Sequence, residues 1–476
     1  MIFQPNHLRP SSGNNFYGFA MILLLGIGCG ASKKVVDPHR TGDIDTNAKF
    51  DQYNPKTGQI EKTASGEVPV DTIEWEVVDQ TSFPPIENPI IEEVPAGPTT
   101  KSQMLDNYSI SFLLPFLYNS FDNIQGVPNN KSLLAINYYY GAKMAFSRLG
   151  QEGLNINVNV FDTQASTSVT SSFLSGGAVP ESNLIIGPAK KENVALVADF
   201  CKNSGITMFS PFNASPTIAK DNPFYVQARP TLESHGKKII EHALARYQPE
   251  QIVLVVRDKG VEKKRLKIFQ EEYPVNSSDS LGKFQELILP GDLKSLAEYD
   301  LMPIIKQDVE TVFIMPSWSN ESFIYSFLRQ IRVVKGQNPV VVYGMPQWME
   351  YERISYDYYE ALNVHVSSEF FVDTESQSVK NFQREFFEKY GMIPDKNAYK
   401  GYDEMMFLGR RLQNNGTFWQ ENSGKEIGEI SGSEFMINPV LKTETPPISE
   451  GFPMERYQND AVDIIQFKDY RFRKEL

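Results

Sequence analysis

The sequence predicts an α/β protein of two lobes, each a doubly wound parallel sheet, preceded by a disordered tether. From residue 108 onward, short apolar runs alternate with helical patterns of about 10–15 residues. This alternation restarts near residue 232, which indicates a second sheet. The 476 residues are roughly three times the length of a typical domain, so there is room for two lobes and a long additional segment.

Composition excludes several classes of protein. A hydrophobic fraction of 41% supports sizeable cores, so global disorder is excluded. With a net charge of −13, the chain lacks the excess of basic residues that is typical of a nucleic-acid-binding protein. Two cysteines cannot build a disulfide framework or a Cys-rich zinc site, and the five histidines are scattered without metal-ligand spacing. We therefore expect no nucleic-acid partner, no metal and no cofactor.

The N-terminus has the pattern of a targeting segment. Residues 16–27 are apolar, but they are too few to span ~30 Å of hydrocarbon and match the core of a signal peptide. Small residues directly before Cys29 resemble the bacterial lipobox, with Gly26 where leucine is usual. The resemblance implies that residues 1–28 are a lipoprotein signal peptide and that Cys29 carries lipid. The alternative is an ordinary secretory signal with a chance cysteine.

Residues 29–103 are expected to form a lipid-anchored, acidic, proline-rich linker. Such a tether repels itself and stays extended. One stretch, residues 72–78 (TIEWEVV), has a strand-like pattern. It is either a solvated piece of linker, a strand docked on the folded part, or a partner-binding motif.

The first lobe is expected over residues 104–228. A buried apolar run at 109–115 ends at proline, and a helix over 133–149 follows, closed by two glycines. Further strands are predicted at 156–161, 183–186, 206–209 and 224–227, with a helix over 192–202. Strands that alternate with helices favour a parallel sheet covered on both faces.

The second lobe is expected over residues 229–364. Predicted helices cover 232–247, 261–272, 293–307 and 320–334, and predicted strands cover 251–256, 284–289, 311–315, 340–343 and 364–366. The tail over 461–472 alternates like a terminal strand or hairpin. Open α/β sheets bind ligands at the C-terminal ends of their strands, so polar residues at those ends are candidates for a site.

Three stretches together resemble the type I periplasmic solute-binding proteins, the leucine/isoleucine/valine-binding class. They are Gly187-Pro188 with residues 210–216 after the next strand, residues 224–230 (FYVQARP), and residues 386–403 with their FFEKYG and AYKGYD motifs. The third stretch is the most specific of the three. The match covers about residues 108–415, in order and with suitable spacing.

Two further stretches look like one branch of this family, found in Gram-negative envelope lipoproteins. They are residues 345–350 (MPQWME) and 361–366 (ALNVHV). Some members of that branch carry an N-terminal LysM module, which we do not find in this sequence.

The resemblance implies two lobes joined by three crossovers, which close on a small ligand. A partner protein then recognises the closed shape. The crossovers are expected at residues 227–231, 362–371 and 434–439. Residues 365–476 are expected to return through both lobes and to supply the C-terminal strands.

The resemblance also implies where the first lobe binds ligand. Amino-acid binders of this family hold the substrate carboxylate with a serine after Gly-Pro and with amides at a helix N-terminus. Here Ala189, Lys190 and Lys191 follow, so that serine is missing, which disfavours a free amino acid. Lys190 and Lys191 either bind an anion as point charges or are solvated residues of the first helical turn.

Four other polar residues follow first-lobe strands. Asp162 either caps the next helix or faces the cleft. Ser210, Asn213 and Ser215 form a turn whose hydroxyls and amides either point at ligand or only shape the turn.

In the second lobe, Arg257, Trp318 and Trp348 each follow a predicted strand. The tryptophans either stack on a sugar or heterocycle or pack between the lobes. Asp403 is expected to cap a helix or contact the other lobe, and Cys201 is expected to be buried and inert. The sequence contains no phosphate-binding loop and no nucleophile elbow, so we expect no enzyme.

Two functions compete. The first is a lipid-anchored envelope protein that binds a small solute between its lobes, as the substrate-binding component of an ABC-type, amino-acid-like uptake system with a permease partner. The second is a non-transport scaffold or regulator of peptidoglycan synthesis or envelope assembly. Both place the protein in the envelope of a Gram-negative bacterium, bound to the membrane through lipid. By resemblance to the sorting pattern of bacterial lipoproteins, Gly30 in place of aspartate after the cysteine favours the periplasmic side of the outer membrane.

Overall fold

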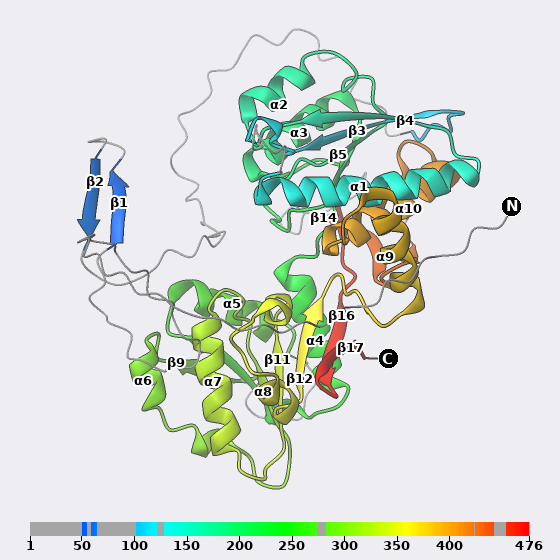
Figure 1. Cartoon of the computed structure of the whole chain (residues 1–476). Helices are drawn as coiled ribbons and strands as arrows, with labels where there is room; N and C mark the ends of the chain where they lie inside the picture. Colours follow the sequence, from blue (N-terminus) through cyan, green and yellow to red (C-terminus); the bar gives the residue numbers. More distant parts are fainter. Residues whose placement is uncertain are drawn as a thin grey trace, which may run out of the picture. The chain divides into compact units, whose positions relative to one another are not determined.

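The structure is a computed structural model that describes residues 101–120, 128–273, 282–422, 424–441 and 454–475, and two strands nearer the N-terminus (Figure 1). Those strands, β1 (Phe50–Asn54) and β2 (Gln59–Thr63), form an antiparallel pair in a unit of their own. The sequence pattern did not predict this pair within the linker. The expected signal peptide, Cys29 and residues 72–78 lie outside the described residues.

The first lobe is an eight-stranded sheet in the order β13-β14-β15-β7-β6-β5-β3-β4. The strands β3, β4, β5, β6, β7 and β15 are parallel, whereas β14 runs antiparallel between β13 and β15. The bounds are β3 (Tyr108–Leu114), β4 (Ile156–Asp162), β5 (Leu184–Ile186), β6 (Thr207–Ser210), β7 (Tyr225–Gln227), β13 (Lys425–Ile427), β14 (Glu434–Leu441) and β15 (Met454–Asn459).

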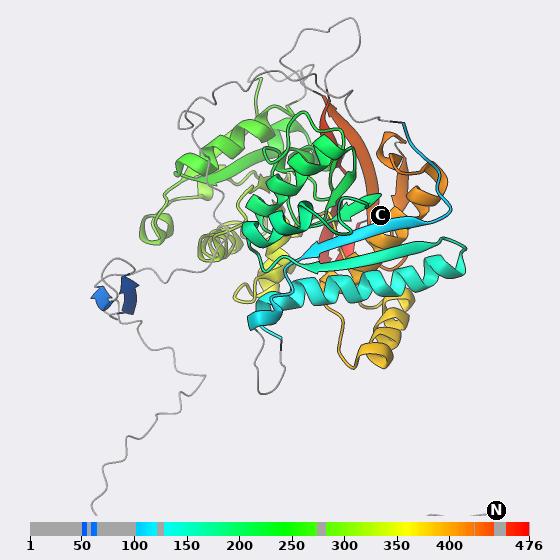
Figure 2. The ribbon, with the colours of Figure 1, turned by 90° about the horizontal axis from the view of Figure 1, so that it is seen from above.

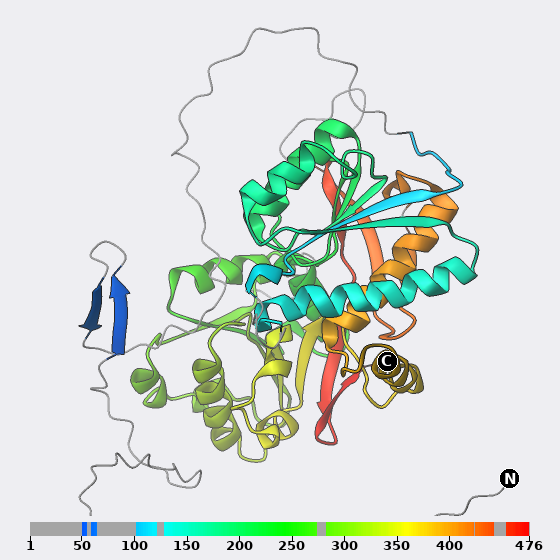
Figure 3. The ribbon, with the colours of Figure 1, turned by 45° about the horizontal axis from the view of Figure 1, so that its top comes forward.

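Helices cover this sheet, and two of them are in close contact. The helices over the sheet are α1 (Asn130–Gln151), α2 (Thr167–Leu174), α3 (Lys191–Ser204) and α10 (Lys396–Asn415), and α9 (Gln377–Tyr390) packs on α1 and α10. Phe112 of β3 packs edge-on against Tyr139 and Phe146 of α1, which runs along β3 and β4 (Figure 2). Helix α1 also lies beside α10 (Figures 1 and 3), so the C-terminal part of the chain completes the first lobe.

The second lobe is a seven-stranded sheet in the order β17-β16-β12-β11-β10-β8-β9. Its strands β12, β11, β10, β8 and β9 are parallel, and the hairpin of β16 and β17 adds two antiparallel strands at the β12 side of the sheet. The strand bounds are β8 (Ile252–Arg257), β9 (Gln285–Leu289), β10 (Thr311–Ile314), β11 (Val340–Gly344), β12 (Val364–Ser368), β16 (Asp463–Lys468) and β17 (Arg471–Lys474).

The helices of the second lobe enclose a core of its own. They are α4 (Leu232–Leu244), α5 (Gly260–Gln270), α6 (Leu293–Ala297), α7 (Glu321–Val334) and α8 (Tyr356–Ala361). The single helix expected over 293–307 is wrong, because α6 ends at Ala297 and only a short 3₁₀ turn, Met302–Ile304, follows. Pro303 lies within the expected helix, where it would remove a backbone hydrogen bond.

Three crossings connect the lobes. The first crossing (residues 228–231) leads from β7 to α4, and the second crossing (369–376) leads from β12 to α9. The third crossing (460–462) leads from β15 to β16. The sequence placed this third crossing at 434–439, which is wrong, because those residues belong to β14 in the first sheet. No helix among the described residues is long and apolar enough to cross a membrane.

Candidate interlobe site

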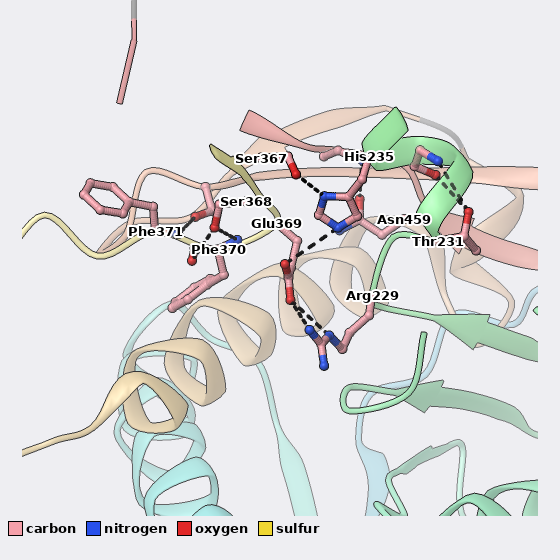
Figure 4. A network of polar contacts seen from close by, with 12 residues as sticks. Arg229, Thr231, His235, Ser367, Ser368, Glu369, Phe370, Phe371 and Asn459 are labelled. Carbon is pink, nitrogen blue, oxygen red and sulfur yellow. Dashed lines mark hydrogen bonds and ion pairs between the residues drawn. The ribbon is translucent and has the colours of Figure 1, made fainter. Parts of the chain in front are cut away.

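Charged residues of the first two crossings pair with each other (Figure 4). Arg229 of the first crossing donates from Nε and Nη2 to Oε1 of Glu369 of the second crossing, at 3.0 and 2.6 Å. His235, in the first turns of α4, hydrogen-bonds from Nδ1 to Ser367 Oγ at 2.9 Å, and its Nε2 lies 3.9 Å from Glu369. The side chain of Arg229 is 34% exposed and that of Glu369 is 13% exposed. The pair is therefore largely desolvated but still reached by solvent.

Burial decides the charge states of this group. Burial lowers the pKa of His235 to about 4, although Glu369 opposes that shift. Burial also disfavours the Glu369 carboxylate, but Arg229, His235 and Lys400 outweigh it and hold the pKa of Glu369 well below its usual range. At neutral pH the crossings therefore hold a carboxylate and a guanidinium beside a neutral imidazole.

The third crossing is bound to α4 through Asp460. Ser234 of α4 donates to Oδ1 of Asp460 at 2.9 Å, and Gln458 donates to the same oxygen at 2.6 Å. Asn438 of β14 donates to the other carboxylate oxygen at 3.1 Å. Polar contacts thus connect the start of α4 to both of the other crossings, so a rotation of the lobes changes these contacts together.

Helix α10 supplies a second buried ion pair. Asp395 starts this helix by accepting the N–H groups of Asn397 and Ala398, at 2.7 and 3.2 Å. One turn later, Lys400 donates to the Pro211 carbonyl at 2.8 Å and lies 3.6 Å from Glu404. Pro211 follows β6, so the ammonium group lies at the C-terminal end of a first-lobe strand.

Burial shifts both partners of this pair. The Tyr138 hydroxyl donates to Glu404 at 2.6 Å, yet burial still raises the pKa of Glu404 to about 7. Burial lowers the pKa of Lys400, and Glu404 opposes that shift. Strongly shifted groups within one cluster are a common sign of a functional site.

One further ion pair joins the two lobes directly. Lys396, at the first position of α10, pairs with Glu350, which ends the 3₁₀ turn Pro346–Glu350 after β11. Arg229 interacts electrostatically with Glu350 and Glu404, and Lys400 interacts with Glu369 and Lys396. We call these six residues the interlobe charge cluster: Arg229, Glu350, Glu369, Lys396, Lys400 and Glu404. Its three cations and three carboxylates can bind both ends of a doubly charged molecule.

Of the residues that the sequence selected in the first lobe, Asp162 has a clear structural role. Its carboxylate accepts the backbone N–H groups of Leu117 and Tyr118, both at 3.0 Å, and that of Gln164. It therefore fixes the loop after β3. It does not cap α2, because Ser166 does so.

The two lysines after Gly187-Pro188 are exposed. Lys190 is the N-cap residue of α3 and provides no side-chain cap, and its ammonium lies 3.8 Å from Glu192. Lys191 starts the helix and is also exposed. Both side chains therefore reach solvent, with Lys190 beside the carboxylate of Glu192.

The turn after β6 is buried. Ser210 is fully buried and interacts with the Tyr225 hydroxyl. Asn213 accepts the N–H of Ser215 at 2.9 Å, and Ser215 bonds to Thr217 at 3.1 Å. These side chains shape the turn, and the Pro211 carbonyl of the same turn accepts a hydrogen bond from Lys400.

The candidates of the second lobe are engaged within that lobe. Arg257 pairs with the buried Glu262, with 2.7 Å between Nε and Oε1. Trp348 is fully buried, and its indole N–H donates to the Ser317 carbonyl at 2.8 Å. Trp318 is half-buried and lies under the Arg265 guanidinium, 5.3 Å from the ring centre. Trp348 therefore packs in the core and presents no surface to a ligand.

Two other residues named from the sequence are buried. Asp403 accepts from the backbone N–H groups of Ile430 and Ser431, both at 2.9 Å, so it holds the loop over 428–433. Cys201 is fully buried, and burial raises the pKa of its thiol. Among the described residues, no group of three or more His, Cys, Asp or Glu side chains is placed to hold a metal ion.

The residues of the interlobe charge cluster were not among the sequence candidates. Three of them lie inside the stretches that carried the family resemblance: Arg229 in FYVQARP, Lys400 in AYKGYD and Glu350 in MPQWME. Charged residues inside otherwise apolar or aromatic motifs were the sequence feature that could have indicated this cluster. Glu369 carried no such signal, because its partner Arg229 is 140 residues away in the sequence.

Comparison with known proteins gives the fold. No protein-family model matches the chain, and no curated protein matches its sequence. A putative branched-chain amino acid ABC transporter from Rhodospirillum rubrum matches with a TM-score of 0.54 and 13% identity, over 78% of this chain and 100% of that chain.

Two other solved structures are similar. A branched chain amino acid ABC transporter periplasmic ligand-binding protein from Burkholderia xenovorans matches with a TM-score of 0.52 and 12% identity, over 78% of this chain and 94% of that chain. The C-domain of LpoA from Haemophilus influenzae, described as a regulator of PBP1A, matches with a TM-score of 0.49 and 12% identity, over 77% of this chain and 100% of that chain.

Proposed function

We propose that this chain, which has the fold of the type I periplasmic binding proteins, binds a small solute that carries both a positive and a negative group. The observation that carries the proposal is the interlobe charge cluster. It draws on both lobes and two crossings, and it includes the carbonyl at the end of β6, where open α/β sheets bind ligands.

The chemistry of the cluster suggests how such a solute binds. The carboxylate of the solute meets Arg229 and Lys400, which take the place of the serine that is missing after Gly187-Pro188. Its ammonium meets Glu369 and Glu350. The solute then takes the place of the partner that Arg229 and Glu369 have in each other, so neither of these two charges is left unpaired.

An amino-acid-like solute fits this pattern of charge. The two solved structures with TM-scores above 0.5 are described as branched-chain amino acid ABC transporter proteins, which supports a solute of that class. We propose the substrate-binding component of an ABC-type uptake system as the role, with a permease as partner, and binding without catalysis.

We also propose that the protein is anchored in the Gram-negative envelope through lipid on Cys29, on the periplasmic side of the outer membrane. The small residues before Cys29 and the apolar run over 16–27 support the anchor. Acyl chains contribute about 0.8 kcal/mol per buried CH₂, so two or three chains hold a protein firmly on a membrane.

A thermal-shift screen of amino acids, short peptides, sugars and muropeptide fragments tests the binding proposal. A solute that binds the folded state raises the melting temperature by mass action. Calorimetry then compares Arg229→Gln with Arg384→Gln, a matched change on the exposed face of α9. We expect Arg229→Gln to weaken binding roughly tenfold or more and Arg384→Gln to leave it unchanged. A folded protein that no solute stabilises contradicts the proposal.

A second function, a non-transport scaffold or regulator of peptidoglycan synthesis or envelope assembly, is favoured by a different observation. The cluster residues already satisfy one another, and Lys190 and Lys191 are exposed beside the end of β5. Crosslinking in cells followed by mass spectrometry separates the two functions. Recovery of cell-wall synthesis proteins supports the second function, and recovery of permease subunits alone supports transport.

A further inference from the structure

Strand β4 lies at the edge of the first-lobe sheet and pairs there with β3. Asn155, just before β4, accepts a backbone hydrogen bond from β3 at 3.0 Å, and Thr163, just after β4, donates one to β3 at 2.9 Å. Residues that bond the same neighbour alternate along a parallel strand, so the odd-numbered residues of β4 face β3. The N–H and C=O groups of Ile156, Val158 and Val160 therefore point to the outer side. In the part of the chain that the structure describes, no strand pairs with β4 on that side.

The other three edge strands of the two lobe sheets carry charge. The charged residues are Lys425 and Glu426 in β13, Glu286 in β9, and Arg471, Arg473 and Lys474 in β17. Charged side chains on an edge strand oppose its pairing with another chain. Strand β4 (INVNVFD) has no charged residue before Asp162, whose carboxylate is occupied by backbone N–H groups of the loop after β3. The edge over residues 156–161 therefore lacks this protection.

The side chains of β4 form a symmetrical pattern. Val160 lies opposite Phe112 of β3, which packs on α1. The β-branched residues at 156, 158 and 160 therefore share the face toward α1, and the asparagines at 157 and 159 share the other face. In both directions from Val158, the strand continues with an asparagine and then a β-branched residue. Such a strand matches its own sequence in reverse, which is the match that an antiparallel contact between two copies needs.

We propose that β4 pairs with β4 of a second copy of this chain, antiparallel and about a two-fold axis at Val158. Ile156 then lies opposite Val160 of the second copy, and Asn157 lies opposite Asn159. Pairs of β-branched side chains and pairs of amides stabilise neighbouring strands. The outward N–H and C=O groups of each copy form the new ladder, so the two first-lobe sheets become one continuous sheet.

The charge at the end of β4 selects this register. An axis at Asn159 would place Asp162 opposite Ile156 of the second copy, and an axis at Asn157 would pair only residues 156–158 of β4. An axis between two residues would set an outward-facing residue against an inward-facing one. The axis at Val158 pairs residues 156–160 and leaves Asp162 outside.

A single pair of short strands is a small interface. Stable interfaces bury roughly 1,200–2,000 Å², so we expect a weak dimer that dissociates on dilution. Strand β4 belongs to the first lobe, and neither the three crossings nor the interlobe charge cluster includes any of its residues. The second lobe of each copy therefore stays free to rotate, and the dimer does not depend on whether a solute binds.

Sedimentation velocity tests the dimer on the full chain with Cys29→Ser, which cannot carry lipid, at roughly 5 to 500 μM. We expect monomer at the lowest concentration and dimer at the highest. In amide hydrogen exchange over the same range, the N–H groups of Ile156, Val158 and Val160 should gain protection as the dimer forms. A protein that stays monomeric throughout would overturn the proposal. Protection of these amides in the monomer would also overturn it, because another part of the same chain would then cover the edge.

Two lysine variants localise the contact. Val160 on β4 is 40% exposed, and Ile288 on β9, the edge strand of the second-lobe sheet, is 41% exposed. Val160→Lys places a charge opposite Ile156 of the second copy and should weaken dimerisation at least about tenfold. Ile288→Lys is the matched control and should leave dimerisation unchanged. Dimerisation that Val160→Lys does not weaken, or that both variants weaken equally, would refute pairing through β4.

Cysteine crosslinking tests the register. Directly opposite residues of a hydrogen-bonded antiparallel pair have Cα atoms about 5.5 Å apart, within reach of a disulfide. In the Cys29→Ser background, oxidised Val158→Cys should therefore give a disulfide-linked dimer, whereas Asn155→Cys, exposed just before β4, should not. Cys201 does not compete, because it is fully buried. Crosslinking of both variants alike, or of neither, would contradict an axis at Val158.

Discussion

At the scale of single residues, the region between the lobes contains charges that neutralise one another, and Glu369 and Glu404 are its most deeply buried carboxylates. Arg229 and Glu369 are both ionised, because each is the nearest opposite charge of the other. Glu404 differs, because burial dominates its environment and moves its pKa toward neutral pH. The charge of the cluster therefore depends on pH in the physiological range, mainly through Glu404.

The raised pKa of Glu404 predicts a pH dependence of stability. The folded protein holds this proton up to about pH 7, whereas the unfolded chain releases it near the usual value of 4.5. The contribution of Glu404 to the free energy of unfolding is therefore fully present below about pH 4.5. It is lost as the pH rises from about 4.5 to 7.

Urea unfolding of wild type and Glu404→Gln measures this contribution. The stability of wild type relative to the variant should fall by about 1–3 kcal/mol between pH 5 and pH 7. The exposed change Glu388→Gln on α9 is the control and should give a flat difference. A Glu404→Gln difference that does not change with pH would show that Glu404 is ionised throughout.

His235 predicts a loss of stability in acid. Its pKa in the folded protein is lowered to about 4, so the unfolded chain binds a proton between pH 6.5 and 4 that the folded protein does not. The contribution of His235 to the free energy of unfolding is fully present above pH 6.5 and is lost as the pH falls toward 4. Replacing it, in His235→Gln, should make the decline between pH 6 and 4.5 shallower by about 1.4 kcal/mol per pH unit. An identical decline in both proteins would contradict the neutral imidazole.

At the scale of elements, the first lobe depends on a close contact between α1 and α10. A Cβ atom at Gly141 would lie 1.8 Å from the Ala398 carbonyl oxygen, and one at Gly401 would lie 2.0 Å from that of Tyr138. Only glycine allows two helix backbones to approach this closely. The same contact positions Lys400 and Glu404 beside the end of β6. These two helices therefore both stabilise the first lobe and position part of the candidate site.

A pair of alanine variants tests that contact. In Gly401→Ala the helices must separate, so we expect a loss of about 3 kcal/mol in the free energy of unfolding. In Gly150→Ala, near the end of α1, no atom lies within 4 Å of the added Cβ. That control should be neutral or more stable by about 0.5 kcal/mol, because alanine favours the helix. Equal losses of unfolding free energy in the two variants would show that the close approach of α1 and α10 does not contribute to stability.

At the scale of the whole molecule, periodicity predicted the α/β class and the two sheets, because apolar runs and helical patterns are local. The partner of a strand is not local. Residues 434–439 were therefore assigned to a crossing, although they lie in β14, an antiparallel strand of the first sheet. The same limit hid the site, because Lys400 and Glu404 lie inside a helix and find partners at Pro211 and Tyr138, far away in the sequence.

Ser210 ends β6, and the next residue, Pro211, contacts Lys400, but several side chains selected at strand ends have internal partners. Trp348 fills the space over Gly344, and Arg257 is paired with Glu262. Their positions after strands were predicted correctly, whereas the direction of each side chain depends on neighbours that no local pattern encodes. Charge inside an apolar motif, as at Arg229, was the better indicator of the interlobe charge cluster.

The central claim is that the interlobe charge cluster binds a doubly charged solute. A crystal structure of the protein grown with the best solute from the thermal-shift screen tests it most directly. We predict density for that solute between the lobes, with its carboxylate within hydrogen-bond distance of Arg229 or Lys400 and its ammonium near Glu369 or Glu350. Solute density elsewhere, or the internal pair of Arg229 and Glu369 intact beside a bound solute, would contradict the claim.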